Sequence, residues 1–175
     1  MESDILIETL LSAGLMALSL LSLNLLVLTV ARLVAPERRP ARVSIPDGEL
    51  PRVLVQLPLY NEGELVQRIL GAVTALDWPK DRLEIQVLDD STDGSCALSR
   101  EAVSALQEAG WSVELLHRTH RVAYKAGALA AGLARSDAPF VAIFDSDFIP
   151  PPSWLRETIG VLAGDSSLAF VQTRW

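Results

Sequence analysis

The longest apolar stretch of the chain lies at its N-terminus, where residues 9–31 contain no charged side chain. As a helix this stretch would rise about 35 Å, which is enough to cross a hydrocarbon core about 30 Å thick. A cleaved signal peptide is the alternative, but it has a basic start and an apolar part of about 7–15 residues. Here the start is acidic, with Glu2, Asp4 and Glu8. The pattern favours one retained transmembrane helix, residues 5–34.

Basic residues flank this predicted helix on one side only. No Lys or Arg precedes it, and four arginines border its end or follow it: Arg32, Arg38, Arg39 and Arg42. The positive-inside rule then predicts that the chain after residue 35 lies in the cytoplasm. Residues 35–50 are rich in proline and charge, so we expect a linker near the membrane face.

Beyond Pro51 the pattern changes to short β-type runs that alternate with segments of helical periodicity. Strands are predicted at residues 52–57, 83–88, 112–116, 140–144 and 168–173. Helices are predicted between them, at residues 64–76, 95–109, 125–134 and 153–162. Because such alternation forms right-handed βαβ units, we expect a mostly parallel α/β sheet over residues 51–175. The run at 140–144 is wholly apolar, which is typical of a strand buried on both faces.

Charge and cysteine content narrow the class of protein. The formal net charge of −7 argues against a nucleic-acid-binding protein, which would normally be basic. The single cysteine, Cys96, excludes an internal disulfide, and we interpret it as a packing residue in a reducing compartment. His117 and His120 have the spacing of a metal-binding pair, but their loop offers Arg118 and Arg121 rather than a third ligand. We expect solvent-exposed histidines.

A pair of aspartates follows the apolar run at 140–144, in the sequence Asp145-Ser146-Asp147. Because alternate residues of a strand point the same way, both carboxylates can share one divalent cation. Mg²⁺ typically takes one or two carboxylates together with phosphate oxygens of a substrate. A solvated turn is the alternative, since Asp and Ser also favour turns.

The first predicted strand is followed by Tyr60, Asn61 and Glu62. We expect Tyr60 and Glu62 to bind a nucleobase. The structural alternative is a capping box in which Asn61 pairs with Glu64 at the start of the next helix.

The second predicted strand ends at Asp89 and Asp90, where a carboxylate can accept hydrogen bonds from a base or ribose; a turn is again the alternative. Lys125 opens a predicted helix, whose amide groups already favour an anion. A lysine complements the helix dipole poorly there, which indicates a role toward a ligand; a solvated helix end is the alternative. Doubly wound sheets bind ligands at the carboxyl ends of their strands, so these clusters together predict a site for a diphosphate and its metal ion.

In combination, these segments resemble family 2 glycosyltransferases of the GT-A (Rossmann-like) fold, and within them the cellulose synthase-like enzymes that make β-mannan or β-glucan chains. The resemblance covers roughly residues 50–175 and is carried, in order, by residues 53–62, 86–93, 124–129, 144–148 and 171–175. Several motifs in one order are far more specific than any one of them.

The resemblance implies a nucleotide-sugar donor, a UDP- or GDP-hexose, bound with Mg²⁺ or Mn²⁺. In the family, the donor pocket would be lined by Tyr60, Glu62, Asp90, Lys125 and Asp145. Asp90 would contact the base or ribose, and Lys125 would face the nucleotide or its diphosphate. Asp147 would hold the cation, with Asp145 near the ribose and metal.

The chain departs from the family at three places. Ser146 stands where Ala is usual, which changes little. Ala123 stands where the family has Gly, and this costs free energy if the backbone needs a positive φ. The family also continues to a segment with the catalytic base and to a Gln-x-x-Arg-Trp motif, which the sequence at residues 172–175 is not. We therefore expect a fragment of a longer enzyme, with an incomplete sheet and with the catalytic base beyond Trp175.

The leading hypothesis is thus a membrane-bound, inverting glycosyltransferase that extends a β-linked polysaccharide or glycosylates a lipid. A non-catalytic, membrane-tethered nucleotide-binding protein is a second hypothesis. A receiver-like signalling module ranks last, because its Asp pair ends the first strand and its Lys follows the last one.

Overall fold

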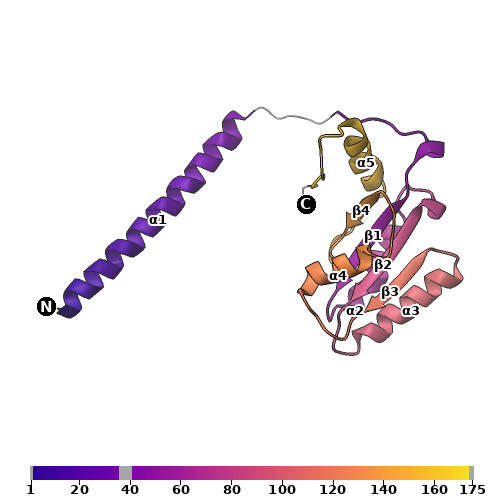
Figure 1. Cartoon of the computed structure of the whole chain (residues 1–175), viewed down its shortest axis with the longest axis horizontal. Helices are drawn as coiled ribbons and strands as arrows, with labels where there is room; N and C mark the ends of the chain where they lie inside the picture. The colour runs from indigo at the N-terminus through magenta and orange to yellow at the C-terminus, as the bar shows by residue number, and fades with distance from the viewer. Residues whose placement is uncertain (1, 36–40, 174–175) are drawn as a thin grey trace. The chain divides into compact units, whose positions relative to one another are not determined.

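The structure is a computed structural model that describes residues 2–35 and 41–173. The described chain forms two compact units, one holding residues 2–35 and the other residues 41–173. The first unit is the single helix α1 (Glu2–Val34), and the second is an α/β domain (Figure 1). Arg38 and Arg39 of the predicted linker lie outside the described residues.

Helix α1 carries large apolar side chains on every side, and they are about half or more exposed. Its hydroxyl groups at Thr9, Ser19 and Thr29 donate hydrogen bonds of 2.7–2.8 Å to carbonyl oxygens four residues earlier. Such internal pairing is what a polar group needs in hydrocarbon, where water offers no partner. Ile5–Val34 is long and apolar enough to cross a membrane, and its insertion stays a prediction.

The α/β domain alternates strands and helices. Their order is β1 (Val53–Leu59), α2 (Gly63–Thr74), β2 (Leu83–Asp89), α3 (Ser95–Glu108), β3 (Val113–His117), α4 (Tyr124–Leu133), β4 (Phe140–Ile143) and α5 (Trp154–Gly164). Two short 3₁₀ helices, η1 (Asp47–Glu49) and η2 (Lys80–Arg82), precede β1 and β2. Each predicted helix and the first four predicted strands match these elements to within about two residues.

The four strands form one parallel sheet in the order β3-β2-β1-β4 (Figure 1). In register, Val53 of β1 lies opposite Leu83 of β2 and Phe140 of β4, and Ile85 of β2 lies opposite Val113 of β3. The predicted parallel α/β sheet is confirmed. Because all strands run the same way, their carboxyl ends meet at one edge of the sheet.

The main core lies on the sheet face that packs against α2, α3 and α5. There Val53, Val55 and Leu57 of β1 are fully buried in one cluster with Ile69 and Val73 of α2. At the end of the core, the rings of Phe144 and Trp154 meet edge to face, with centroids 4.7 Å apart. This packing fixes where β1 and β4 end, and with them the residues that follow.

The opposite face of the sheet carries a buried polar layer under α4. The Gln56 side-chain amide donates to Gln86 Oε1 (3.0 Å) and to Leu129 O (3.1 Å), and the Gln86 amide donates to Gly132 O (3.0 Å). An added Cβ at Gly132 would lie 2.5 Å from Gln86 Oε1 and 2.6 Å from Gln56 Nε2, so a side chain there would displace these paired amides. These contacts fix the body of α4 on β1 and β2, and so place the first turn of α4 at the carboxyl edge.

Strand β4 corrects one expectation from the sequence. Val141 and Ile143 are 40% and 47% exposed, so this apolar strand is not buried on both faces. Within the described residues β4 pairs with β1 alone, and α4 packs over β1 and β2 instead. The apolar run predicted the strand correctly, but burial depends on neighbours that a run cannot specify.

The fifth predicted strand, residues 168–173, is also wrong. These residues follow α5 without strand pairing, and no described strand runs beside them. A strand exists through its ladder of hydrogen bonds, and here the segment is held otherwise, with Trp154 Nε1 donating to Thr173 Oγ1 at 3.3 Å.

Residues 41–50 run along the α/β domain. Val43 N donates to Gly160 O of α5 (3.0 Å), Arg156 of α5 pairs with Asp47 (2.7 Å), and Leu50 is buried in the core.

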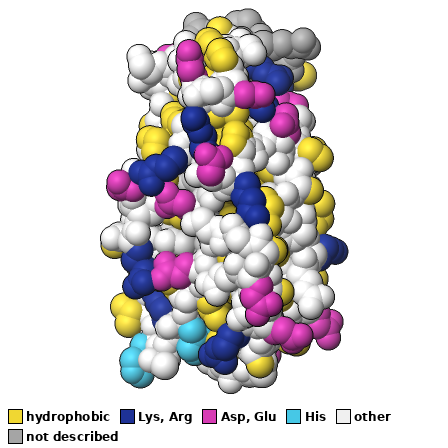
Figure 2. Space-filling view, turned by 90° about the vertical axis from the view of Figure 1, so that its right-hand side faces the viewer, with side chains coloured by type: hydrophobic (Ala, Val, Ile, Leu, Met, Phe, Trp, Pro, Cys, Tyr) yellow, Lys and Arg dark blue, Asp and Glu magenta, His cyan; other side chains and the backbone are white. Residues whose placement is uncertain are grey.

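Basic and acidic side chains are interspersed on the face seen in Figure 2, and neither sign dominates it. The absence of nucleic-acid binding rests on the net charge of −7 and stays a prediction.

Candidate functional site

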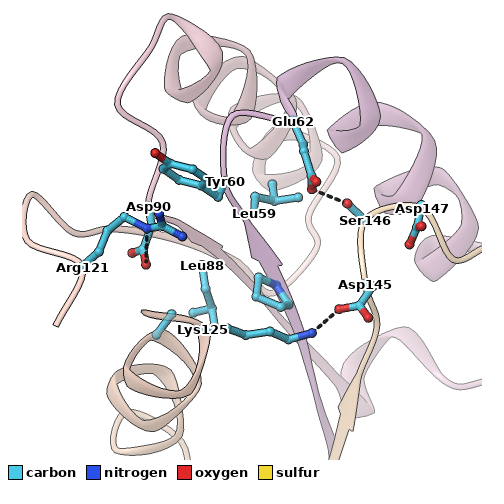
Figure 3. Close-up of a pocket in the computed structure, with 12 residues that line it drawn as sticks. Leu59, Tyr60, Glu62, Leu88, Asp90, Arg121, Lys125, Asp145, Ser146 and Asp147 are labelled. Atoms are coloured by element: carbon cyan, nitrogen blue, oxygen red, sulfur yellow. Dashed lines mark hydrogen bonds and ion pairs between the residues drawn. The ribbon is translucent and has the colours of Figure 1, made fainter. Parts of the chain in front are cut away.

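A pocket of about 400 Å³ opens at the carboxyl edge of the sheet (Figure 3). Its walls come from the ends of β1 and β2, the first turns of α4 and the turn after β4. All six site residues predicted from the sequence line it: Tyr60, Glu62, Asp90, Lys125, Asp145 and Asp147. The structure therefore brings together residues that lie up to 87 positions apart in the chain.

Asn61 shapes the wall that follows β1. Its backbone is left-handed, with φ 56°, its N–H donates to Ser91 Oγ (2.8 Å), and its Oδ1 accepts from Thr92 N (3.0 Å). The structural alternative, a capping box of Asn61 with Glu64, is wrong, because Glu62 occupies the N-cap of α2 and no side-chain capping bond forms. Asn61 instead joins the β1 loop to the β2 loop, and Tyr60 remains 40% exposed at the pocket.

Asp90 lies at the end of β2 and is almost fully buried. Its Oδ1 accepts from Arg118 Nε (2.8 Å) and its Oδ2 from Arg118 Nη2 (2.5 Å). These bonds raise the pKa of the Arg118 guanidinium above its usual value. Arg121 Nε lies 3.8 Å from Asp90 Oδ2 and has no hydrogen-bond partner in the described structure. The expected contact of Asp90 with a base or ribose stays a prediction.

Arg121 is a pocket residue that the sequence analysis missed. Its guanidinium lies 3.3 Å from the ring centroid of Tyr60 and 5.4 Å from that of Tyr124, in a cation–π stack. The available signal was a pair of arginines, Arg118 and Arg121, between the third strand and the helix that Lys125 opens. Next to His117 and His120, these two arginines indicate only a basic loop.

Lys125 lies in the first turn of α4, directly after a strained stretch of backbone. Ala123 and Tyr124 have φ values of 56° and 47°. Ala123, where the family has Gly, therefore does adopt a positive φ. Lys125 Nζ forms an ion pair with Asp145 across the pocket (Figure 3).

Asp145 and Asp147 lie in a turn rather than on β4, which ends at Ile143. Phe148 N closes the turn by donating to Asp145 O (3.0 Å). The argument from strand alternation is therefore wrong, yet both carboxylates line the pocket. Between them, the Ser146 hydroxyl is buried and donates to Glu62 Oε2, which ties this turn to the start of α2 (Figure 3).

The carboxylates of Asp145 and Asp147 suit a cation that is also coordinated by a bound ligand. Asp145 is half exposed and Asp147 is exposed, so both can reach a bound group. The described residues contain no cluster of three or more His, Cys, Asp or Glu that would hold an ion unaided. Two carboxylates completed by phosphate oxygens are a usual magnesium site. His117 and His120 are exposed, as expected, and lie outside this pocket.

Several known proteins are similar to this chain in sequence or in structure. Residues 55–175 match the family described as Glycosyl transferase family 2. The chain is 42% identical over 151 residues to glucomannan 4-beta-mannosyltransferase 1 of Oryza sativa subsp. japonica, which covers 80% of this chain and 29% of that protein. It is 42% identical over 150 residues to glucomannan 4-beta-mannosyltransferase 2 of Arabidopsis thaliana, with 80% and 28% covered.

Among solved structures, the mannosyltransferase PcManGT from Pyrobaculum calidifontis, in complex with GDP-Man and Mn²⁺, superposes with a TM-score of 0.61. The two chains are 32% identical, and the match covers 72% of this chain and 36% of that one. The expected GT-A fold is confirmed by this likeness together with the parallel sheet. The chain spans less than a third of the length of the curated relatives named above. Within that span, it belongs to glycosyl transferase family 2.

Proposed function

We propose that the protein binds a nucleoside-diphosphate hexose, with GDP-mannose as the first candidate, and serves its transfer to a β-linked polysaccharide. One observation carries the proposal: polar side chains from four separate segments converge in one pocket at the carboxyl edge of the sheet. Membership of family 2 supports the reaction class.

The pocket has two chemically different sides. Tyr60, Arg121 and Asp90 offer a ring, a guanidinium and a buried carboxylate, which suit a nucleobase and ribose (Figure 3). Asp145 and Asp147 lie opposite, where a diphosphate with its cation would bind (Figure 3). We assign Glu62 to the wall between them, because Ser146 already donates to its carboxylate.

A Mg²⁺ or Mn²⁺ ion held by Asp145 and Asp147 would stabilise the negative charge of the departing nucleoside diphosphate. Lys125 would contribute a further positive charge at the diphosphate. The acceptor hydroxyl attacks the anomeric carbon, the bond from that carbon to the diphosphate oxygen breaks, and the anomeric configuration inverts. We assign the base that takes the hydroxyl proton to none of the described pocket residues.

The choice of donor and acceptor rests on the relatives. The curated relatives are described as glucomannan 4-beta-mannosyltransferases, and the solved mannosyltransferase holds GDP-Man with Mn²⁺. The alternatives within the same reaction class are a UDP-hexose as the donor and a lipid as the acceptor. We place α1 in the membrane and the α/β domain in the cytoplasm, on the length and composition of α1 and the arginines after it.

Calorimetry with the full chain in detergent micelles tests this function. GDP-mannose, UDP-glucose and ADP-glucose are each titrated in the presence of Mn²⁺. We expect GDP-mannose to bind at least about tenfold more tightly than ADP-glucose, a difference near 1.4 kcal/mol. Tighter binding of UDP-glucose would change the donor but keep the reaction class, whereas no binding of any of the three would contradict the proposal.

A further inference from the structure

Arg118 lies behind the pocket wall and is not among the residues that line it. We infer that Arg118 is a positioning residue, which holds residues 118–125 in a strained turn and thereby presents Arg121 and Lys125 to the ligand. The inference rests on the proposed function for the identity of that ligand. Its structural part, that one side chain holds the turn, stands independently.

Within the described residues, the side-chain hydrogen bonds that join the turn to Asp90 come from the Arg118 guanidinium, and Arg121 adds an ion pair to the same carboxylate (3.8 Å). Arg118 donates to both carboxylate oxygens of Asp90, at 2.8 and 2.5 Å. The same group donates to Val122 O (3.2 Å) and to Tyr124 O (2.9 Å). Asp90 is rigidly placed, since it is 3% exposed at the end of β2. Arg118 therefore connects a fixed carboxylate to both ends of the stretch between Val122 and Tyr124.

The backbone conformation of that stretch is strained, so other contacts must stabilise it. Ala123 and Tyr124 are consecutive residues with a Cβ in the left-handed region, where the Cβ crowds the following carbonyl. Burial does not hold this stretch, since Tyr124 and the preceding Val122 are 69% and 75% exposed. Strained backbone of this kind persists only where the surroundings over-determine it. Here the Arg118 guanidinium donates to two carbonyl oxygens of the stretch, in addition to the backbone bond from Tyr124 N to Arg121 O (3.0 Å).

Gly127 of α4 leaves room for the Arg118 guanidinium and for the carbonyl oxygen of Val122. A Cβ added there would lie 2.8 Å from Arg118 Nη1 and 2.1 Å from Val122 O. The arginine and the turn carbonyl thus approach the helix backbone as closely as a glycine allows. A lysine at position 118 would bring one ammonium group without the planar fork, and could not bind Asp90 in two places while reaching both carbonyls.

The consequence for the pocket follows from the order of residues. Arg121 lies inside the held turn, and Lys125 comes directly after Tyr124 at the start of α4. If Arg118 is removed, Ala123 and Tyr124 relax to negative φ, and both basic side chains leave their places. Ligand binding then requires the strained turn to form again, which lowers the apparent affinity.

Limited trypsin digestion of the full chain in detergent tests the structural part without any ligand. In Arg118→Lys, we expect cleavage after Arg121, identified by mass spectrometry, at least about tenfold faster than in the wild type, the factor for strain of about 1.4 kcal/mol. The matched control is Arg135→Ala, which removes the guanidinium that pairs with Glu114 elsewhere on the domain. Equal cleavage rates in Arg118→Lys and the wild type would overturn the inference.

A second experiment separates positioning from direct ligand contact. We expect Arg118→Ala to weaken Mn²⁺-dependent GDP binding about tenfold, and the added substitution Ala123→Gly to recover part of that loss, because Gly accepts a positive φ without strain. No recovery would overturn the positioning role. Circular dichroism reports whether each variant is folded. If wild-type chain binds no GDP, the proposed function fails, while the trypsin result still decides the role of Arg118.

Discussion

At the scale of single residues, the Lys125 ammonium and the Asp145 carboxylate neutralise each other across the pocket. Both groups are about half exposed, so the pair contributes little to stability and can exchange partners. In the proposed function, a diphosphate with its cation would supply both new partners at once: phosphate oxygens for Lys125 and the metal for Asp145. We therefore propose that the ion pair orders these two side chains before a ligand binds.

Replacing Lys125 by alanine tests whether Lys125 contacts the diphosphate of the ligand. We expect Lys125→Ala to weaken GDP binding about tenfold or more, the usual effect of losing a hydrogen bond to a charged group, and to leave guanosine binding unchanged. Calorimetry of both ligands measures the difference. Lys80→Ala is the control, because Lys80 contacts Ala109 O and the ring of Trp111, outside this pocket. An equal loss for guanosine and GDP would contradict a contact with the diphosphate.

Cys96 supplies a second prediction at this scale. Burial raises the pKa of its thiol, and the nearby charge of Asp89 raises it further. Because the thiolate is the reactive form, we expect Cys96 to react slowly with Ellman's reagent at pH 7.5, and faster in urea or at higher pH. Reaction of the native chain as fast as a free thiol at pH 7.5 would contradict the interpretation as a packing residue.

At the scale of elements, the position of α4 depends on the polar layer beneath it. Gln56 and Gln86 bind carbonyl oxygens of α4, and Gly132 lets those side chains approach. A buried polar layer that is fully paired fixes one arrangement, whereas an apolar layer would allow sliding. The first turn of α4 carries Lys125, so this layer also determines the place of a pocket residue.

Two glycine substitutions within helices separate packing from helix propensity. We expect Gly132→Ala to destabilise the fold by about 1–3 kcal/mol, because its Cβ would clash with Gln86 and Gln56. Gly71→Ala in α2 has open space, so we expect it to stabilise by about 0.5–1 kcal/mol. Thermal denaturation of the full chain, followed by circular dichroism, compares the two. A Gly132→Ala chain as stable as Gly71→Ala would contradict the role of the polar layer.

At the scale of the whole molecule, sequence periodicity located the elements well because each is a local pattern. Motifs at strand ends located the pocket, since a parallel sheet brings carboxyl ends together. The exposure of β4 and the absent strand at residues 168–173 could not be predicted, because both depend on which segments become neighbours. The roles of Arg118 and Arg121 depend on how a loop folds back onto Asp90, and no periodic pattern encodes that.

The membrane topology is a further prediction at this scale. Because four arginines follow the uncharged run at residues 9–31, and residues 1–8 contain no Lys or Arg, we expect residues after 35 to remain cytoplasmic. Fusions of alkaline phosphatase and of green fluorescent protein to the C-terminus of the chain report this in bacteria. We expect fluorescence without phosphatase activity, and a chain that resists extraction by alkaline carbonate. Phosphatase activity without fluorescence would contradict the orientation.

The most direct test of the central claim is the metal dependence of GDP binding to this pocket. Calorimetry with the full chain in detergent compares Mn²⁺ with excess chelator, in the wild type and in Asp147→Ala. We predict that GDP binds wild-type chain with Mn²⁺ at least about tenfold more tightly than in chelator, and that Asp147→Ala loses this difference. His120→Ala, outside the pocket, is predicted to keep it. Equal affinity in Mn²⁺ and chelator for the wild-type chain would contradict the account.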